Sequence, residues 1–126
     1  MILRIQPESE EPIYRQLVSQ LIMGLARGEL RPGETLAPVR QLATELGINM
    51  HTAAKVYQVL QQEGYLVNNR QKGFTVASGM PSADNVFREH FIDRLSQAVA
   101  EAALRGMSRE DCLKACAQAY DDIRKE

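Results

Sequence analysis

The fold of this chain is decided by residues 36–76, which read LAPVRQLATELGINMHTAAKVYQVLQQEGYLVNNRQKGFTV. Pro38 precedes an apolar pattern that ends at Gly47, and Asn49 precedes a second pattern that ends at Gly64. Both patterns fit short helices, because proline is favoured at a helix start and glycine just beyond a helix end. The β-prone segments that follow flank a polar tip containing glycine, which is typical of a hairpin. Helix, tight turn, helix and hairpin in this order predict a winged helix-turn-helix, whose second helix fits the major groove of DNA.

Outward from this stretch, helical spacing predicts where the helices lie. Apolar residues recur every three or four positions over residues 11–27, which indicates an additional helix before the quoted stretch. The next helix is expected over residues 38–46, and the third is expected to begin after Asn49, which caps it. We expect the third helix to bury one apolar stripe, which consists of Ala53, Val56, Tyr57 and Leu60.

The hairpin is expected to be short. Residues 65–67 and 74–76 are β-prone and surround a polar tip at residues 68–73, whereas Leu36 is expected in a short extended piece before the second helix. Residues 1–78 therefore form the predicted winged helix-turn-helix domain.

Length and charge limit what the chain can bind. Its 126 residues carry a formal net charge of −1, so any nucleic-acid site must be local rather than a general basic coat. No apolar run approaches the roughly 20 residues of a membrane span, and the start is too short for a signal peptide, so we expect a cytoplasmic chain with reduced cysteines. Between residues 40 and 78 only Glu45 and Glu63 oppose the basic residues, which are Arg40, Lys55, Arg70 and Lys72.

Several phrases of the sequence resemble the GntR family of transcriptional regulators. The similarity covers about residues 11–77 and rests on PIYRQL (12–17), GELRPGETL (28–36), VRQLA (39–43), GIN (47–49), Thr52, KVY (55–57), EGYL (63–66) and KG (72–73). The short tail is similar to the YtrA-type subfamily, in which two helices replace a larger effector domain. The resemblance implies a regulator that binds DNA, and such regulators often control neighbouring transporter genes.

The chain departs from the family pattern at three places. Ala37 and Pro38 replace the usual Pro-Ser, which removes a hydroxyl that could cap the second helix or contact a phosphate. Gln71 replaces a glycine at the tip of the wing, so the tip is expected to be stiffer. Met50 replaces a proline that is common in the subfamily, and its flexible side chain could contact a thymine methyl group or lie on a sugar.

The chemistry of the polar side chains identifies candidate DNA contacts. The planar fork of Arg40 suits a phosphate or a guanine, although a surface salt bridge with Glu45 or Glu34 is the alternative. His51 and Lys55 lie on the polar face of the third helix with Gln58 and Gln62. The candidate DNA-binding residues are Arg40, Asn49, Met50, His51, Thr52, Lys55, Arg70, Lys72 and Gly73.

Two of these candidates also have simple structural explanations. His51 could be an ordinary solvated histidine, and Thr52 could only start the helix, although hydroxyl groups at such positions commonly donate to phosphate oxygens. Tyr57, which lies between them and the wing in sequence, is expected in the core rather than on DNA.

After Ser78 the chain changes character, and residues 79–126 are expected to form a dimerisation tail. A linker at 79–82 precedes a helix over 83–105, and Gly106 separates it from a second amphipathic helix that begins near Ser108. Two such helices lack a core of their own, so two copies should associate as a four-helix arrangement around a two-fold axis. The predicted interface residues are Phe87, Phe91, Leu95, Val99, Ala102, Leu113, Cys116 and Tyr120.

Other functions find little support in the sequence. No nucleophile has a plausible base, no phosphate-binding loop is present, and we expect no cofactor and no metal. Cys112 and Cys116, one helical turn apart, are expected to behave as small apolar residues rather than as a redox pair. The leading interpretation is a mainly α-helical repressor that binds a palindromic operator in double-stranded DNA as a homodimer, with an effector unknown. The alternative is a winged-helix module that contacts proteins and has no specific affinity for DNA.

Overall fold

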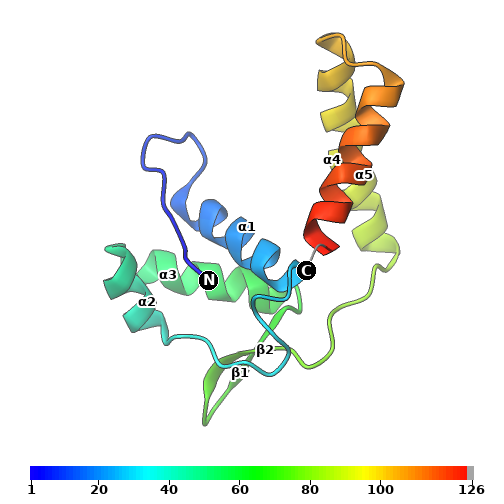
Figure 1. Ribbon diagram of the computed structural model, residues 1–126. Helices are drawn as coiled ribbons and strands as arrows, with labels where there is room; N and C mark the ends of the chain where they lie inside the picture. Colours follow the sequence, from blue (N-terminus) through cyan, green and yellow to red (C-terminus); the bar gives the residue numbers. More distant parts are fainter. Residues whose placement is uncertain (125–126) are drawn as a thin grey trace. The chain divides into compact units, whose positions relative to one another are not determined.

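A computed structural model describes residues 1–124 of the chain, and its elements are mainly helical with one antiparallel hairpin (Figure 1). This confirms the predicted fold class. The chain divides into two compact units, Met1–Pro81 and Ser82–Glu126. No helix in the described part of the chain is long and apolar enough to cross a membrane.

The first helix of the first unit, α1, spans Ile13–Ala26. Pro12 stands immediately before it in an extended conformation, and Gly28 follows it with a φ of 79°. Leu17, Val18 and Leu21 are buried along one side of the helix, as the spacing of three and four residues requires. The helix is shorter than the predicted span by two residues at its start and one at its end.

The next two helices form the helix-turn-helix. Helix α2 spans Val39–Leu46, beginning one residue after Pro38, whose ψ of 150° keeps it outside the helix. Gly47 ends α2 in the left-handed conformation, which costs glycine little because it has no Cβ. Helix α3 spans Met50–Gln62 and buries all four residues of the predicted stripe: Ala53, Val56, Tyr57 and Leu60.

The hairpin, or wing, consists of β1 (Leu66–Asn69) and β2 (Gly73–Val76). Leu66 pairs with Val76 and Asn69 with Gly73, so the strands run closer to the tip than the sequence indicated. The predicted extended piece at Leu36 lies along the free edge of β2, where its N–H donates to the Phe74 carbonyl at 2.9 Å. Because β2 is bonded on both edges, the wing is fixed to the segment that leads into α2.

The segment before α1 is also fixed, through a pairing that the sequence did not predict. Gln16 and Gln20 lie one helical turn apart on α1. The side-chain amide of each accepts a hydrogen bond from the backbone N–H of one residue in the extended N-terminal segment and donates another to the carbonyl of the same residue. Gln16 bonds with Gln6, and Gln20 bonds with Arg4, over distances of 2.6 to 3.1 Å. Leu3 and Ile5, whose side chains alternate with these residues, pack against the core of the first unit.

The second unit is a pair of helices joined by a tight turn. Helix α4 spans Asn85–Leu104, and its N-cap Asp84 accepts a hydrogen bond from the Phe87 N–H at 2.8 Å. Gly106 turns the chain with a φ of 87°, and helix α5 spans Arg109–Arg124. Ser108 caps this helix, since its Oγ accepts from the Asp111 N–H at 3.0 Å. Between residues 82 and 124 no side chain is buried.

Candidate nucleic-acid interface

The first turn of α3 exposes the side chains that the sequence singled out. Asn49 caps the helix as expected, because its Oδ1 accepts a hydrogen bond from the His51 N–H at 2.7 Å. This bond occupies the amide oxygen of Asn49 and leaves its Nδ2 group as the part able to reach a base. Met50 is 45% exposed and His51 is also exposed, whereas Thr52 is half-buried. Met50 and His51 therefore form the accessible end of the helix.

Arg40, in the first turn of α2, carries an exposed guanidinium group. Neither carboxylate that could have formed a salt bridge with it does so. Glu45 accepts a hydrogen bond from Gln41 at 2.8 Å, and Glu34 accepts one from the Arg31 N–H at 3.1 Å. Within residues 1–124 the Arg40 side chain has no carboxylate partner, so its charge is available to an anion outside the protein.

Lys55 continues the exposed face of α3 one turn beyond His51. Its ammonium group lies over the ring of Tyr14 in α1, with Nζ 3.9 Å from the ring centroid. The sequence did not predict this contact, because helical spacing places Tyr14 and Lys55 on their own helices and does not pair the helices. A cation over an aromatic face is attracted by the negative face of the ring.

Tyr57 connects the elements that carry these candidate side chains. It is only 2% exposed, its hydroxyl donates to the Ala37 carbonyl at 2.6 Å, and its ring packs against Phe74 with a centroid distance of 4.9 Å. Burial, together with the smaller effect of the nearby Glu45 carboxylate, raises the pKa of Tyr57 to about 12. One residue of α3 thus joins the helix to the segment before α2 and to strand β2.

The bond from Tyr57 does not depend on which side chain stands at position 37. The backbone carbonyl of Ala37, not its side chain, receives the Tyr57 hydroxyl. The prediction that Tyr57 belongs to the core is confirmed by its burial.

The tip of the wing exposes Arg70 and Lys72. Its shape is set by Asn69, whose Oδ1 accepts hydrogen bonds from the backbone N–H groups of Gln71 at 2.8 Å and Lys72 at 3.2 Å. Gly73 completes the turn with a φ of 79°. Asparagine side chains commonly hold turns in this way, so the tip forms with Gln71 in place of a second glycine.

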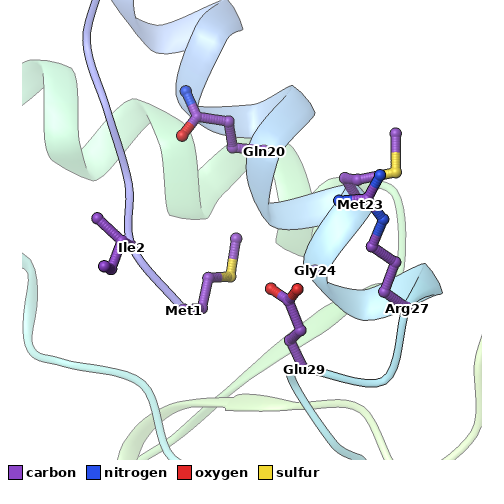
Figure 2. A pocket seen from close by; sticks show the side chains of 7 residues that line it. All are labelled: Met1, Ile2, Gln20, Met23, Gly24, Arg27 and Glu29. Atoms are coloured by element: carbon purple, nitrogen blue, oxygen red, sulfur yellow. The ribbon is translucent and has the colours of Figure 1, made fainter. Parts of the chain in front are cut away.

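All nine candidate DNA-binding residues lie in the first unit, on α2, on the capped start and polar face of α3, or on the wing. They are separate from the open depression in Figure 2, where Met1 and Glu29 approach Gly24 near the end of α1. A Cβ on Gly24 would lie 2.5 Å from the Met1 sulfur, so the methionine packs there because this residue is glycine. None of the depression's lining residues is a DNA-binding candidate.

A known protein family matches this chain over the elements that carry the candidate side chains. The profile of the family described as "Bacterial regulatory proteins, gntR family" matches residues 13–76, which run from the start of α1 to the end of the wing. The chain belongs to the GntR family. Members of this family are DNA-binding transcriptional regulators and not enzymes, so this GntR protein is a regulator of transcription.

Three similar proteins extend the comparison. The HTH-type transcriptional repressor YtrA of Bacillus subtilis is 29% identical over 110 residues, which cover 86% of this chain and 85% of YtrA. The structure of YtrA from Sulfolobus acidocaldarius, a GntR-family transcription factor, has a TM-score of 0.67 and 36% identity, covering 79% of this chain and 99% of that one. The DNA-binding domain of AraR in complex with operator ORX1 has a TM-score of 0.52 and 26% identity, covering 60% of this chain and 93% of that domain.

Proposed function

We propose that this GntR regulator is a repressor that binds a palindromic operator as a homodimer. The observation that carries the proposal is the set of exposed side chains on α2, on the first turn of α3 and on the wing tip, all within the first compact unit. Arg40 has no carboxylate partner in the described part of the chain, Met50 and His51 are exposed on the first turn of α3, and Arg70 and Lys72 lie at the wing tip. An α-helix fits the major groove of B-DNA with the residues near its N-terminus contacting base edges.

Each side chain suits a different part of the duplex. His51 and Met50 are placed to contact base edges, and Met50 offers an apolar surface to a thymine methyl group. Arg40 and Thr52 suit phosphate oxygens beside the groove, and the guanidinium of Arg40 could also take a guanine. The cations of the wing suit the adjacent backbone. Asn49 retains its amide NH₂ group, and Gly73 allows the wing tip to approach closely.

The second unit supports the proposed dimer. The predicted stripe on α4 faces solvent within one chain, with Phe87, Phe91, Leu95 and Val99 each between 39% and 47% exposed. The rings of Phe87 and Phe91 stack with their centroids 6.4 Å apart, which makes one continuous apolar surface. A second copy of the chain would cover this surface and contribute an identical one. The interface would continue over Ala102 of α4 and over Leu113, Cys116 and Tyr120 of α5.

A two-fold dimer predicts the symmetry of its operator. Two identical recognition helices related by a two-fold axis read two inverted half-sites, which make a palindrome. The repressor name of the Bacillus subtilis relative and the operator bound by the AraR domain support the same interpretation. By the resemblance to YtrA-type regulators, the regulated genes would be neighbouring transporter genes.

The proposal can be tested by selecting duplexes from a random library with the full chain. We expect enrichment of an inverted repeat, and we expect the affinity for the selected duplex to fall as salt rises, because each neutralised phosphate releases counterions. A shuffled duplex of the same composition is the control. Failure to enrich any sequence would contradict sequence-specific binding. A complex with another protein that salt does not weaken, without affinity for duplexes, would establish the alternative protein-interaction module.

A further inference from the structure

Lys55 is held in place from outside its own helix. Its Nζ lies 3.9 Å from the ring centroid of Tyr14, a half-buried residue that packs against the core of the first unit. An unrestrained lysine side chain has a flexible four-carbon stem, so fixing its ammonium group normally costs conformational entropy. Here the ring is fixed by the core, and the core therefore fixes the position of the charge.

Among residues 1–124 no carboxylate is paired with the Lys55 ammonium group. The positions one helical turn to either side of Lys55 are His51, Thr52, Gln58 and Val59, none of which is acidic. Among the residues that the structure describes, the aromatic contact is the interaction recorded for the Lys55 ammonium group. A ring contacts one side of the group and leaves its other N–H bonds free to donate.

A second cation lies near the same ring. The guanidinium carbon of Arg15 is 5.7 Å from the centroid of Tyr14. Two positive charges that share one aromatic ring repel each other, and an anion bound between or beside them would relieve the repulsion. Two cations near one ring favour an anion as their external partner.

We propose that Tyr14 is a positioning residue for DNA binding, because its ring holds the Lys55 ammonium group where a phosphate of the operator meets α3. This inference rests on the proposed function and names the part of the ligand that Lys55 contacts. Lys55 lies one turn after His51, so it lies farther from the helix end that enters the groove. A compact ammonium charge suits a phosphate oxygen better than the paired acceptors of a base.

Two substitutions of Tyr14 distinguish the contribution of its ring to DNA binding from that of its hydroxyl group. Tyr14→Leu removes the ring and should weaken binding to the selected duplex by about two- to fivefold, the size expected of an exposed cation–π contact. Tyr14→Phe keeps the ring and should bind within about twofold of the original chain. Lys55→Ala should weaken binding and reduce the slope of log affinity against log salt by about 0.9, because one phosphate contact is lost.

The decisive experiment is a double-mutant cycle with the full chain, measured by fluorescence anisotropy at several salt concentrations. Because Tyr14 acts through Lys55, Tyr14→Leu should have no further effect in a chain that already carries Lys55→Ala. Lys114→Ala removes a lysine from α5 in the second unit and is the matched control, with no expected change in slope. Independent effects of the two substitutions would overturn the proposal, as would Tyr14→Leu binding like the original chain or Tyr14→Phe losing as much as Tyr14→Leu.

Thermal unfolding of every variant distinguishes loss of folding from loss of binding. If Tyr14→Leu does not fold, Tyr14→Met, which also lacks a ring and has a long apolar side chain, takes its place in the cycle. If the original chain selects no duplex, both the proposed function and this inference fail. If it selects a duplex and Lys55→Ala binds that duplex equally well, the proposed function stands and the inference alone is overturned.

Discussion

The first unit buries Leu17, Ala53, Val56 and Leu60 completely, whereas between residues 82 and 124 no side chain is buried. Both units contain a helix with a side-chain cap, Asn49 for α3 and Asp84 for α4, and both have regular apolar spacing, so local sequence signals do not distinguish them. The difference lies in the number of elements that meet. Three helices and a hairpin enclose a core in the first unit, but two helices have only one face to offer each other. The comparison teaches that the first unit encloses a core within one chain, whereas the second leaves its apolar side chains exposed, which is why we propose a partner for it.

The largest effect on assembly should come from placing a charge on the exposed apolar stripe of α4. Phe91→Asp should convert the proposed dimer into monomers, because removing one buried phenylalanine costs about 3 to 5 kcal/mol and a symmetric interface loses two. Light scattering at micromolar concentration measures the change. Ala100→Asp adds the same charge about 180° around α4 from Phe91 and is expected to leave the dimer intact. Dimers that persist in Phe91→Asp would show that another surface covers the second unit.

The same substitution in each unit tests the contrast in burial directly. Leu60→Ala removes a side chain that is 0% exposed and should lower the free energy of unfolding by about 2 to 5 kcal/mol. Leu104→Ala removes one that is 87% exposed and should change it by less than about 0.5 kcal/mol. Urea unfolding of the two variants measures both values. Equal losses would mean that Leu104 is covered in the dimer and that the interface reaches the end of α4.

Alkaline pH should weaken the first unit through Tyr57. Its pKa is about 12 in the folded chain and 10 when unperturbed, so the folded state holds the phenol proton more tightly. The associated stability is complete below pH 10 and is lost as the pH rises toward 12, at about 1.4 kcal/mol per pH unit. The difference between the original chain and Tyr57→Phe in urea unfolding at pH 8, 10 and 11 isolates this contribution. A difference that does not change with pH would contradict the assignment.

The smallest effect on stability is expected at the surface proposed to bind DNA. Arg40→Ala should leave the melting temperature nearly unchanged, because the side chain is exposed and no carboxylate among residues 1–124 pairs with it. Binding to the selected duplex should weaken, and the salt slope should shrink by about 1 if the contact is to a phosphate. Arg27→Ala is the matched control, because it removes an exposed arginine immediately after the last residue of α1 and outside the proposed DNA-binding surface. An affinity equal to that of the original chain would exclude Arg40 from the interface.

Local signals predicted most of the elements. Glycine and proline marked the ends of α2, the asparagine cap marked the start of α3, and the apolar stripe of α3 identified its buried face. The errors lie at boundaries, as at α1, and at the hairpin, where cross-strand bonds extended the strands beyond their β-prone residues. Boundaries of this kind depend on hydrogen bonds to other segments, which a single segment does not encode.

Contacts between distant segments could not be predicted in the same way. Periodicity placed Tyr57 in the core but gave no reason for its hydroxyl to bond with the Ala37 carbonyl. It likewise placed Tyr14 and Lys55 on separate helices without pairing them. Such pairs depend on how the helices cross, and the crossing depends on the packing of the entire core. The candidate site was therefore predicted as a set of residues, but its supporting contacts were not.

The glutamine pairing along the N-terminal segment sets a rule for how that segment can vary among relatives. Gln16 and Gln20 bond with backbone atoms, not side chains, of Gln6 and Arg4, so side-chain identity at residues 4 and 6 is free to vary. Gln16 also donates to the Glu11 carbonyl at 2.8 Å, again a backbone atom. Spacing is constrained, because four residues of helix rise about 6 Å and two residues of extended chain span nearly the same distance. Losing one residue here would turn Leu3 and Ile5 toward solvent. Related sequences should therefore preserve the length of this segment more strictly than its composition.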